Sequence, residues 1–365
     1  MESISPYKKL QHQVAGHGCG DSKLSPVVDN TGCFYKPLQN GTRGEREAEF
    51  YSRVVADFEA DPECCSPSTS LGTLQSFVPR SYGTVNIVLD GRNAAMECLK
   101  LEDLTCSYEQ PCVMDLKMGF NTWYKGCTEA SREKYRLKDL KTTRSKIGFS
   151  VTGMQMYSPC AKQIIRMHKQ KCRDISTREE VLQALRRFVS CQEATDVNWA
   201  AEVYSGKDGV LARLRELTAW FAEQGMYHFS SASVLVMYEG KATAKKLPRD
   251  HLDDANGNTT GHKVVSLKEA DEEGHRKNSE GVADLKKEVD VAVDCHSPKW
   301  ANGDFRVRLC FVDFAHAIEV DGERDTNVYE GLLSLTRALE EVVQTSASRP
   351  SQVVTEPEPI RGGQQ

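Results

Sequence analysis

The feature that most constrains the fold is an apolar stretch, P-C-V-M-D-L-K-M at residues 111–118, that carries an Asp and a Lys two positions apart. Side chains alternate between the two faces of a β-strand, so the even-numbered residues from Cys112 to Met118 share one face that suits a core. Asp115 and Lys117 then share the other face, about 7 Å apart along the strand. A surface ion pair on a half-exposed strand explains this spacing, and so does a site that needs both charges.

The composition is that of an ordinary globular chain. Its 365 residues, 39% hydrophobic and 27% charged, are enough for one large domain or two lobes. The net charge of −5 gives no overall positive field, so we expect no direct binding of nucleic acid. The first residues lack the apolar core of a signal peptide, and no apolar run is long enough to span a bilayer. The 13 cysteines include no C-x-x-C pair, which predicts reduced thiols and a location in the nucleus and cytoplasm.

Strand and helix patterns alternate along the chain, which predicts an α+β fold. Strand patterns lie at residues 12–20, 32–39, 85–90, 94–105, 111–118, 148–159, 227–240 and 305–317. Helix patterns lie at residues 42–60, 129–141, 177–190, 209–225 and 327–343. Thr177 with Glu180 three residues later is a capping-box signature for the third of these helices.

These patterns divide into two groups, from which we expect a small lobe at residues 1–104 and a larger lobe at 105–345. Residues 241–302 are rich in Lys, Asp, Glu, Gly and Asn, a composition that cannot bury a core. We predict that they form a disordered insertion, which could bind protein partners. Residues 346–365 are predicted to form a disordered tail.

A second carboxylate interrupts an apolar strand pattern, in R-L-C-F-V-D-F-A-H-A at residues 308–317. An unpaired carboxylate buried there would cost several kcal/mol, so Asp313 must be paired with a base, hydrogen-bonded by the backbone or bound to a metal. An Asp at a strand end followed by Phe is also the arrangement with which kinases hold Mg²⁺ against ATP phosphates. His316 follows near the same strand end, where a structural role is also open.

A Lys and a Glu in the first lobe have the positions of a kinase pair. Lys36 lies in the strand pattern F-Y-K-P-L-Q, and Glu49 lies in the helix pattern that follows. In two-lobed kinases a strand Lys contacts phosphates and a helix Glu holds it in place, although such coincidences are common. The chain has no P-loop, no G-x-G-x-x-G and no H-R-D motif, which excludes P-loop enzymes and ordinary protein kinases.

The helix pattern at residues 129–141 carries three lysines on one face. Lys134, Lys138 and Lys141 are spaced i, i+4 and i+7, and like charges at this spacing repel each other. Phosphate groups would relieve the repulsion, and a solvated helix face is the alternative. Further positive charge follows at Lys162, Arg166, Lys169, Lys171 and Arg173.

Four stretches in order along the chain resemble the signatures of the inositol polyphosphate kinases. They are H-Q-V-A-G-H at residues 12–17, P-C-V-M-D-L-K-M-G at 111–119, S-S-A-S-V-L at 230–235 and V-D-F-A-H-A at 312–317. The second matches the family's P-x-x-x-D-x-K-x-G signature, and the third resembles its S-S-L-L element with Val234 in place of the first Leu. F-Y-K-P-L-Q and R-R-F-V-S look most like the plant multikinases of this family, whereas G-M-Q-M-Y is closer to the hexakisphosphate kinases.

The resemblance implies a bilobal ATP-grip fold related to protein kinases, with a small N-lobe sheet plus helix and a larger C-lobe with inositide-binding helices. It implies ATP between the lobes, with Lys36 on the phosphates, Glu49 as the partner of Lys36 and Mg²⁺ on Asp313. The other positions that the resemblance places on the nucleotide are Glu102, Leu104, Asp115 and Ser233.

The same resemblance implies roles at the reacting centre. Asp115, Lys117 and Asp313 would be catalytic, with Asp115 on the inositol hydroxyl and Lys117 on a phosphate. The residues implied to bind the inositide are Lys117, Lys134, Lys138, Lys141 and His316.

These roles imply a multikinase that converts inositol trisphosphate and tetrakisphosphate to pentakisphosphate. Two alternatives are open: a hexakisphosphate kinase that makes pyrophosphates, and a mainly non-catalytic, inositide-binding nuclear scaffold. The intact set of Lys36, Asp115, Lys117 and Asp313 argues against the scaffold.

Overall fold

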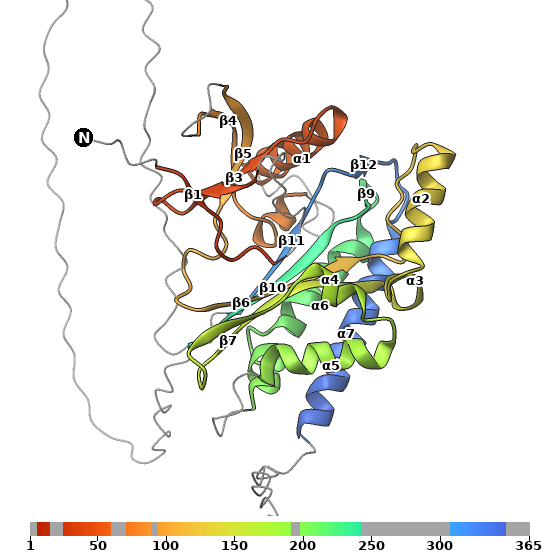
Figure 1. Ribbon diagram of the computed structural model, residues 1–365. Helices are drawn as coiled ribbons and strands as arrows, with labels where there is room; N and C mark the ends of the chain where they lie inside the picture. The colour runs from red at the N-terminus through yellow and green to blue at the C-terminus, as the bar shows by residue number, and fades with distance from the viewer. Residues whose placement is uncertain are drawn as a thin grey trace, which may run out of the picture. The chain divides into compact units, whose positions relative to one another are not determined.

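The computed structural model describes residues 6–14, 25–59, 71–89, 94–190, 198–241 and 307–347, all of which belong to one compact unit. Two five-stranded sheets, a two-stranded sheet and a layer of helices give an α+β fold (Figure 1). The predicted insertion, apart from Lys241, lies outside the described residues. Within the described ranges, no helix is long and apolar enough to cross a membrane.

The first sheet is built from the N-terminal part of the chain. Its strands, in spatial order, are β1 (Lys8–Lys9), β2 (Val27–Val28), β3 (Cys33–Pro37), β5 (Met96–Glu102) and β4 (Ser81–Ile87). Helix α1 (Thr42–Glu59) follows β3 and packs on the short 3₁₀ helix η1 (Leu71–Ser76). The ring of Phe50 on α1 lies 4.3 Å from that of Phe314, so an aromatic contact joins this helix to the C-terminal part of the chain.

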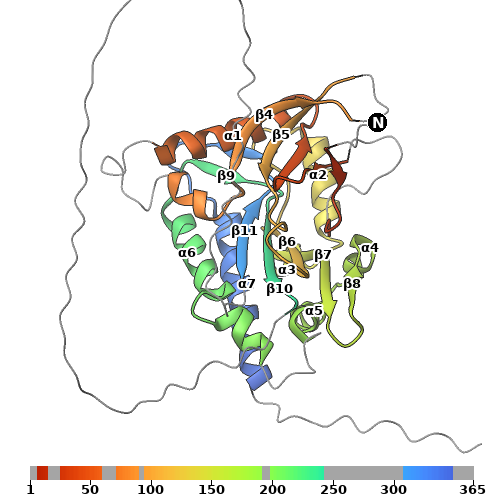
Figure 2. The same cartoon turned by 90° about the vertical axis from the view of Figure 1, so that its left-hand side faces the viewer.

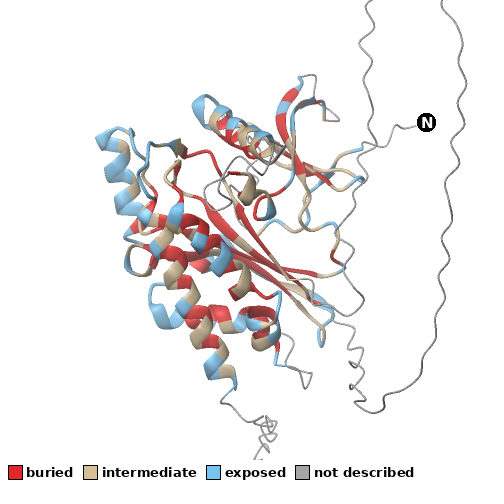
Figure 3. Cartoon of the chain, turned by 180° about the vertical axis from the view of Figure 1, so that it is seen from behind, coloured by how far each residue is buried: buried red, intermediate tan, exposed pale blue. Residues whose placement is uncertain are grey.

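The second sheet has the Asp-Lys strand at its centre. Its spatial order is β11 (Arg308–Val312), β10 (Ser233–Glu239), β6 (Pro111–Met118), β7 (Phe149–Ser158) and β8 (Gln163–Met167). Strand β6 is hydrogen-bonded on both sides, and nearly all of its residues are buried (Figure 3). The prediction of a strand at 111–118 is therefore confirmed, but it lies in the core and is not half-exposed.

Helices pack on the second sheet or beside it. They are α2 (Glu129–Asp139), α3 (Arg144–Ile147), α4 (Lys169–Arg173), α5 (Arg178–Ser190), the π-helical turn η2 (Ala201–Ser205), α6 (Val210–Glu223) and α7 (Thr326–Ala347). In Figure 2, α6 and α7 run along the β11–β10 pair, and α6 packs against β11. Their apolar stripes supply much of the core, as periodic spacing at 3.6 residues requires.

Because Gly331 and Gly148 have no side chains, α7 approaches the sheet closely. A Cβ on Gly331 of α7 would lie 2.5 Å from the carbonyl oxygen of Gly148 and 3.1 Å from the amide nitrogen of Gly119. Both contacts are with backbone, which cannot rotate away. Because Gly119 directly follows β6, this close approach fixes the helix against the end of the central strand.

We expect Gly331→Ala to destabilise the protein by about 1–3 kcal/mol, because the added methyl overpacks this contact. The measurement is the thermal midpoint of unfolding. Arg337→Ala, on the exposed side of the same helix, is the matched control and tests helix propensity alone. An unchanged midpoint in Gly331→Ala would contradict the close approach.

Two of the predicted strands are each broken into two pieces. The pattern at 227–240 forms β9 (Tyr227–Phe229) and β10, and the pattern at 305–317 forms β11 and β12 (Ala317–Glu319). The breaks coincide with left-handed backbone at Ser231 (φ 64°) and Asp313 (φ 71°), which periodicity does not reveal. Strands β9 and β12 leave the second sheet and pair with each other.

Three smaller predictions are also corrected. Helix α2 ends at Asp139, so Lys141 lies beyond it. Helix α7 continues to Ala347, so the first two residues of the predicted tail are helical. Residues 12–14 do not form a strand, and the rest of that pattern lies outside the described residues.

Candidate active site

Lys36 on β3 lies between two carboxylates. Its Nζ is 2.7 Å from Glu47 Oε1 and 2.9 Å from Asp313 Oδ1. Burial opposes the charge of Lys36, but Asp313 and Glu47 outweigh it and raise the pKa of Lys36 above its usual value. The Lys36 ammonium therefore stays charged at the point where the first sheet meets the loop after β11.

The prediction that Glu49 is the partner of Lys36 is wrong. Glu47 is 2% exposed and takes this place, and it also accepts a hydrogen bond from the backbone N–H of Phe314 at 3.2 Å. Two residues correspond to about 200° around a helix, so Glu49 points away from the site. Its side chain is 60% exposed and pairs with Arg53 at 2.8 Å.

Asp115 and Lys117 point to the same side of β6, as the alternation of side chains predicts. Asp115 is 7% exposed and accepts a hydrogen bond from Thr152 Oγ1 at 2.6 Å. Burial raises the pKa of the Asp115 carboxyl, and the charge of Asp313 adds to this effect, although Lys117 opposes it. Lys117 Nζ donates to the carbonyl oxygen of Ser231 at 2.8 Å. Ser233, which is fully buried, is opposite Lys117 in the β10–β6 register.

Asp313 is brought to the site by the break at the end of β11. Its left-handed backbone and its 2.9 Å contact with Lys36 leave the side chain 44% exposed. Asp313 also acts electrostatically on Asp115, so two carboxylates face the same space. Mg²⁺ is usually held by one or two carboxylates together with substrate phosphates, and Asp313, with Asp115 nearby, fits such an ion. The described residues contain no group of three or more His, Cys, Asp or Glu that could hold a metal by themselves.

The segment after β5 contains the two predicted hinge residues. Glu102 forms a bidentate ion pair with Arg308, at 2.6 and 2.9 Å, and its N–H donates to the carbonyl oxygen of Arg80. Its side chain and its N–H are therefore engaged within the protein, and a contact of Glu102 with adenine stays a prediction. Leu104 is half-buried against a small cluster that includes Tyr108 and Val113.

The three predicted inositide-binding lysines do not share one helix face. Lys134 and Lys138 are exposed on α2, whereas Lys141 lies in the turn after it. Burial lowers the pKa of Lys138, and the positive charges of Lys117 and Arg144 lower it further. Lys138 is therefore within electrostatic reach of the catalytic strand.

Two further basic residues belong to the same region, on the short helix α4. Burial lowers the pKa of Lys169, and the charges of Arg173, Lys138 and Lys117 lower it further. These residues had been noted only as downstream positive charge. The position of these residues depends on the β7–β8 hairpin, which brings α4 back beside α2. No local sequence pattern shows this arrangement.

His316 lies in an aromatic group with Tyr124 and Tyr135. It is 7% exposed and stacks on Tyr124, with the ring centroids 4.4 Å apart. Burial lowers the pKa of His316 to about 4, with further lowering by the charges of Arg43, Arg46 and Lys117. The imidazole is therefore neutral at physiological pH. Arg43 and Arg46, from the start of α1, were not identified from the sequence.

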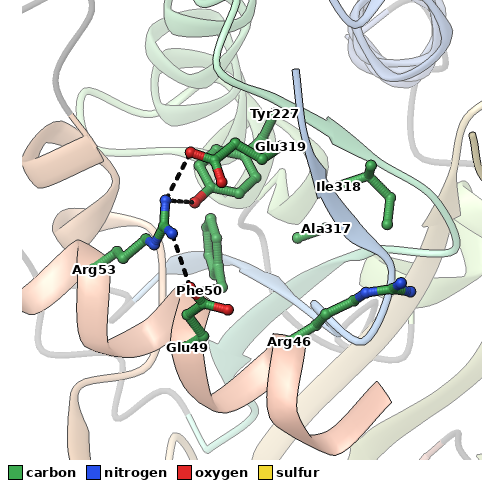
Figure 4. A pocket seen from close by; sticks show the side chains of 8 residues that line it. All are labelled: Arg46, Glu49, Phe50, Arg53, Tyr227, Ala317, Ile318 and Glu319. Atoms are coloured by element: carbon green, nitrogen blue, oxygen red, sulfur yellow. Dashed lines mark hydrogen bonds and ion pairs between the residues drawn. The ribbon is translucent and has the colours of Figure 1, made fainter. Parts of the chain in front are cut away.

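A separate hollow of about 270 Å³ lies between α1 and the β9–β12 pair (Figure 4). Arg53 crosses it to reach Glu49, Glu319 and the Tyr227 hydroxyl. Of the predicted site residues, only Glu49 lines it. We therefore place the reacting centre at Lys36, Asp115, Lys117 and Asp313, outside this hollow.

Comparisons with known proteins identify the family and the fold. Residues 98–340, more than half of the chain, match the family model "Inositol polyphosphate kinase". The inositol polyphosphate multikinase IPK2 of Oryza sativa is 36% identical over 270 residues, which are 69% of this chain and 88% of the relative. The inositol polyphosphate multikinase beta of Arabidopsis thaliana is 29% identical over 344 residues, which are 93% of this chain and 94% of the relative.

Solved structures show the same fold. The crystal structure of the inositol phosphate multikinase Ipk2 from S. cerevisiae, in complex with ADP and Mn²⁺, aligns with a TM-score of 0.54 at 19% identity. The alignment covers 85% of this chain and 98% of that chain. The fold is thus the protein-kinase-related fold of these enzymes, and the chain belongs to the inositol polyphosphate kinase family of ATP-dependent phosphotransferases.

Proposed function

We propose that this protein is an inositol polyphosphate multikinase that transfers the γ-phosphate of ATP to hydroxyls of inositol trisphosphate and tetrakisphosphate, giving pentakisphosphate. The observation that carries the proposal is the placement of basic residues around Lys117. Lys138 on α2 and Lys169 on α4 act electrostatically on each other and with Lys117, and Arg43 and Arg46 on α1 act with Lys117 on His316. A substrate with phosphates on several sides of a small ring would contact both groups.

The nucleotide half of the site follows from the contacts of Lys36. We assign Lys36 to the ATP phosphates and Glu47 to the positioning of Lys36. Asp313 would hold the divalent cation, with Asp115 and Ser233 nearby; we take this cation to be Mg²⁺, and the yeast relative was solved with ADP and Mn²⁺. When bound, the cation supplies neutralisation of phosphate charge. The backbone around Leu104 is left to contact the adenine.

The acceptor half of the site is formed by Asp115 and Lys117. Because burial raises its pKa, the Asp115 carboxylate is a better proton acceptor than an exposed Asp, and we assign it to the attacking hydroxyl. Lys117 would exchange the Ser231 carbonyl for a phosphate of the acceptor. Most of the catalysis then comes from alignment and charge neutralisation, as in other phosphoryl transfers.

Incubation with Mg-ATP and inositol trisphosphate, with products separated by chromatography, tests the proposal. Stepwise formation of tetrakisphosphate and pentakisphosphate is the expected result. Pyrophosphate formation from inositol hexakisphosphate, with no turnover of trisphosphate, would replace the proposal by a hexakisphosphate kinase. Binding of inositol phosphates without turnover of either would replace it by a scaffold.

We expect Lys169→Met to raise the KM for inositol trisphosphate by about tenfold, because a charge-assisted contact with phosphate contributes about 1.5–3 kcal/mol. The KM for ATP is expected to stay unchanged. Lys146→Met, which changes an exposed lysine of α3, serves as the control. Equal KM values in the two variants would remove α4 from the substrate site.

We also propose that the protein acts in the nucleus and cytoplasm, with which eight free thiols among the described cysteines are compatible. Protein partners for residues 241–302 remain a prediction. Imaging a fluorescent fusion with and without these residues tests the location of the protein and the contribution of residues 241–302 to it.

A further inference from the structure

A series of hydrogen bonds runs from Lys117 to the end of α2 and on to strand β7. We name it the polar ring, and its members are Lys117, Ser231, Thr122, Asp139, Arg144 and Ser150. They come from β6, the loop before β10, the segment after β6, the end of α2, the start of α3 and β7. The ring thus joins the catalytic strand to the helix that carries Lys138.

The first half of the ring runs from Lys117 to Thr122. Lys117 Nζ donates to the carbonyl oxygen of Ser231 at 2.8 Å, and Ser231 Oγ donates to the carbonyl oxygen of Thr122 at 3.2 Å. The left-handed backbone of Ser231 accompanies this geometry. A non-glycine residue in this conformation is strained, so the surrounding contacts must hold it there.

The second half returns through Asp139. The N–H of Thr122 donates to Asp139 Oδ2 at 2.7 Å, and Thr122 Oγ1 donates to Oδ1 at 2.8 Å. Arg144 Nη1 donates to the same carboxylate at 3.1 Å, and its Nη2 donates to Ser150 Oγ at 3.2 Å. Ser150 is opposite Lys117 in the β6–β7 register, so the pairing of the two strands, and not a side-chain contact, completes the ring.

The members on the α2 side are buried. Thr122, Asp139, Arg144 and Ser150 are each 5% exposed or less. A buried ion pair contributes little net stability compared with apolar residues of similar volume, because both charges lose their hydration. Stability alone is therefore a weak reason for this network, and its value must lie in fixing a geometry.

The geometry that the ring fixes is the separation of two cations. Lys138 directly precedes Asp139 on α2, and the charges of Lys117 and Arg144 lower the pKa of Lys138. Two ammonium groups this close repel each other unless the backbone that carries them is held. Asp139 is the residue that anchors the end of α2, and Thr122 supplies two of the hydrogen bonds to it.

We propose that the polar ring is a positioning device that holds Lys138 at a fixed place relative to Lys117, with Thr122 and Asp139 as positioning residues for substrate binding. The proposal rests on the proposed function, since it takes both lysines to contact phosphates of the inositol substrate. The ring acts on the acceptor and not on ATP, because it joins Lys117 to the end of α2 and includes neither Lys36 nor its two carboxylate partners.

Thr122→Val tests the ring, because it removes the hydroxyl while nearly keeping the volume. We expect a KM for inositol trisphosphate raised by about tenfold, with the KM for ATP unchanged. Thr122→Ser keeps the hydroxyl and is expected to restore the KM. Thr218→Val is the matched control, since it removes a buried hydroxyl that donates to the carbonyl oxygen of Leu214 in α6.

A double-mutant cycle with Lys138→Met separates positioning from general stability. If Thr122 acts through Lys138, Thr122→Val will raise the KM much less in the Lys138→Met background than in the wild type. Additive effects of the two substitutions would overturn the proposal. So would equal rises of the KM values for inositol trisphosphate and ATP in Thr122→Val, or a KM for inositol trisphosphate in Thr122→Val that equals that of Thr218→Val. Wild-type protein without turnover of trisphosphate would instead contradict the proposed function, so the two failures are distinguishable.

Discussion

Asp313→Asn will lower the rate of phosphate transfer to inositol trisphosphate by at least about 1000-fold, because it removes the one carboxylate that we assign to the divalent cation. The amide keeps the volume of the side chain, and Lys36 still has Glu47 as a partner at 2.7 Å. The fold is therefore expected to survive. The measurement is the single-turnover rate at saturating ATP, beside the thermal midpoint of unfolding.

Asp321→Asn, at an exposed position after β12, is the control and should keep the wild-type rate. The dependence on Mg²⁺ is the second readout, since a weakened site needs more Mg²⁺ for its remaining activity. A rate within tenfold of the wild type, with unchanged Mg²⁺ dependence, would show that Asp313 does not hold the cation.

Glu47→Gln will lower kcat/KM for ATP by about 100-fold, because it removes one of the two negative charges that stabilise the buried Lys36 ammonium. Asp313 would then be the only carboxylate paired with Lys36 and less available to a cation. The measurement is kcat/KM for ATP at fixed inositol trisphosphate.

Glu49→Gln is the matched control, because it makes the same chemical change two residues away in the same helix. Its side chain pairs with Arg53 on the surface, and such pairs contribute at most about 1 kcal/mol. We expect its kcat/KM to remain within twofold of the wild type. The opposite ranking of the two variants would restore Glu49 as the partner of Lys36.

Elements whose apolar or capping residues recur at a regular spacing could be predicted from the sequence. The apolar stripe of α6, the alternation of β6 and the capping box of α5 are local patterns, and the structure confirms all three. At the capping box, Glu180 N–H donates to Thr177 Oγ1 at 3.2 Å and Thr177 N–H donates to Glu180 Oε2 at 3.0 Å. The shared face of Asp115 and Lys117 also follows from the period of two.

The rest of the site depends on backbone breaks and on contacts between distant segments. A buried Glu such as Glu47 looks like any polar position of a charged helix, so the sequence pattern does not distinguish it from Glu49. The left-handed residues Ser231 and Asp313 have no sequence signature, since neither is a glycine and each lies within a strand pattern. Arg43 and Lys169 reach the site only because α1 and α4 are brought there by tertiary packing.

The central position of β6 has a consequence for how the site can change over time. A strand hydrogen-bonded on both sides is among the last parts of a protein to exchange its amide protons, because opening it requires nearly global unfolding. The spacing of Asp115 and Lys117 is thus as durable as the fold itself. Basic residues on α2, α4 and the start of α1 lie on peripheral helices, where substitutions disturb the core least. Diversification of acceptor preference is therefore expected in these helices, while the transfer chemistry on the strand stays the same.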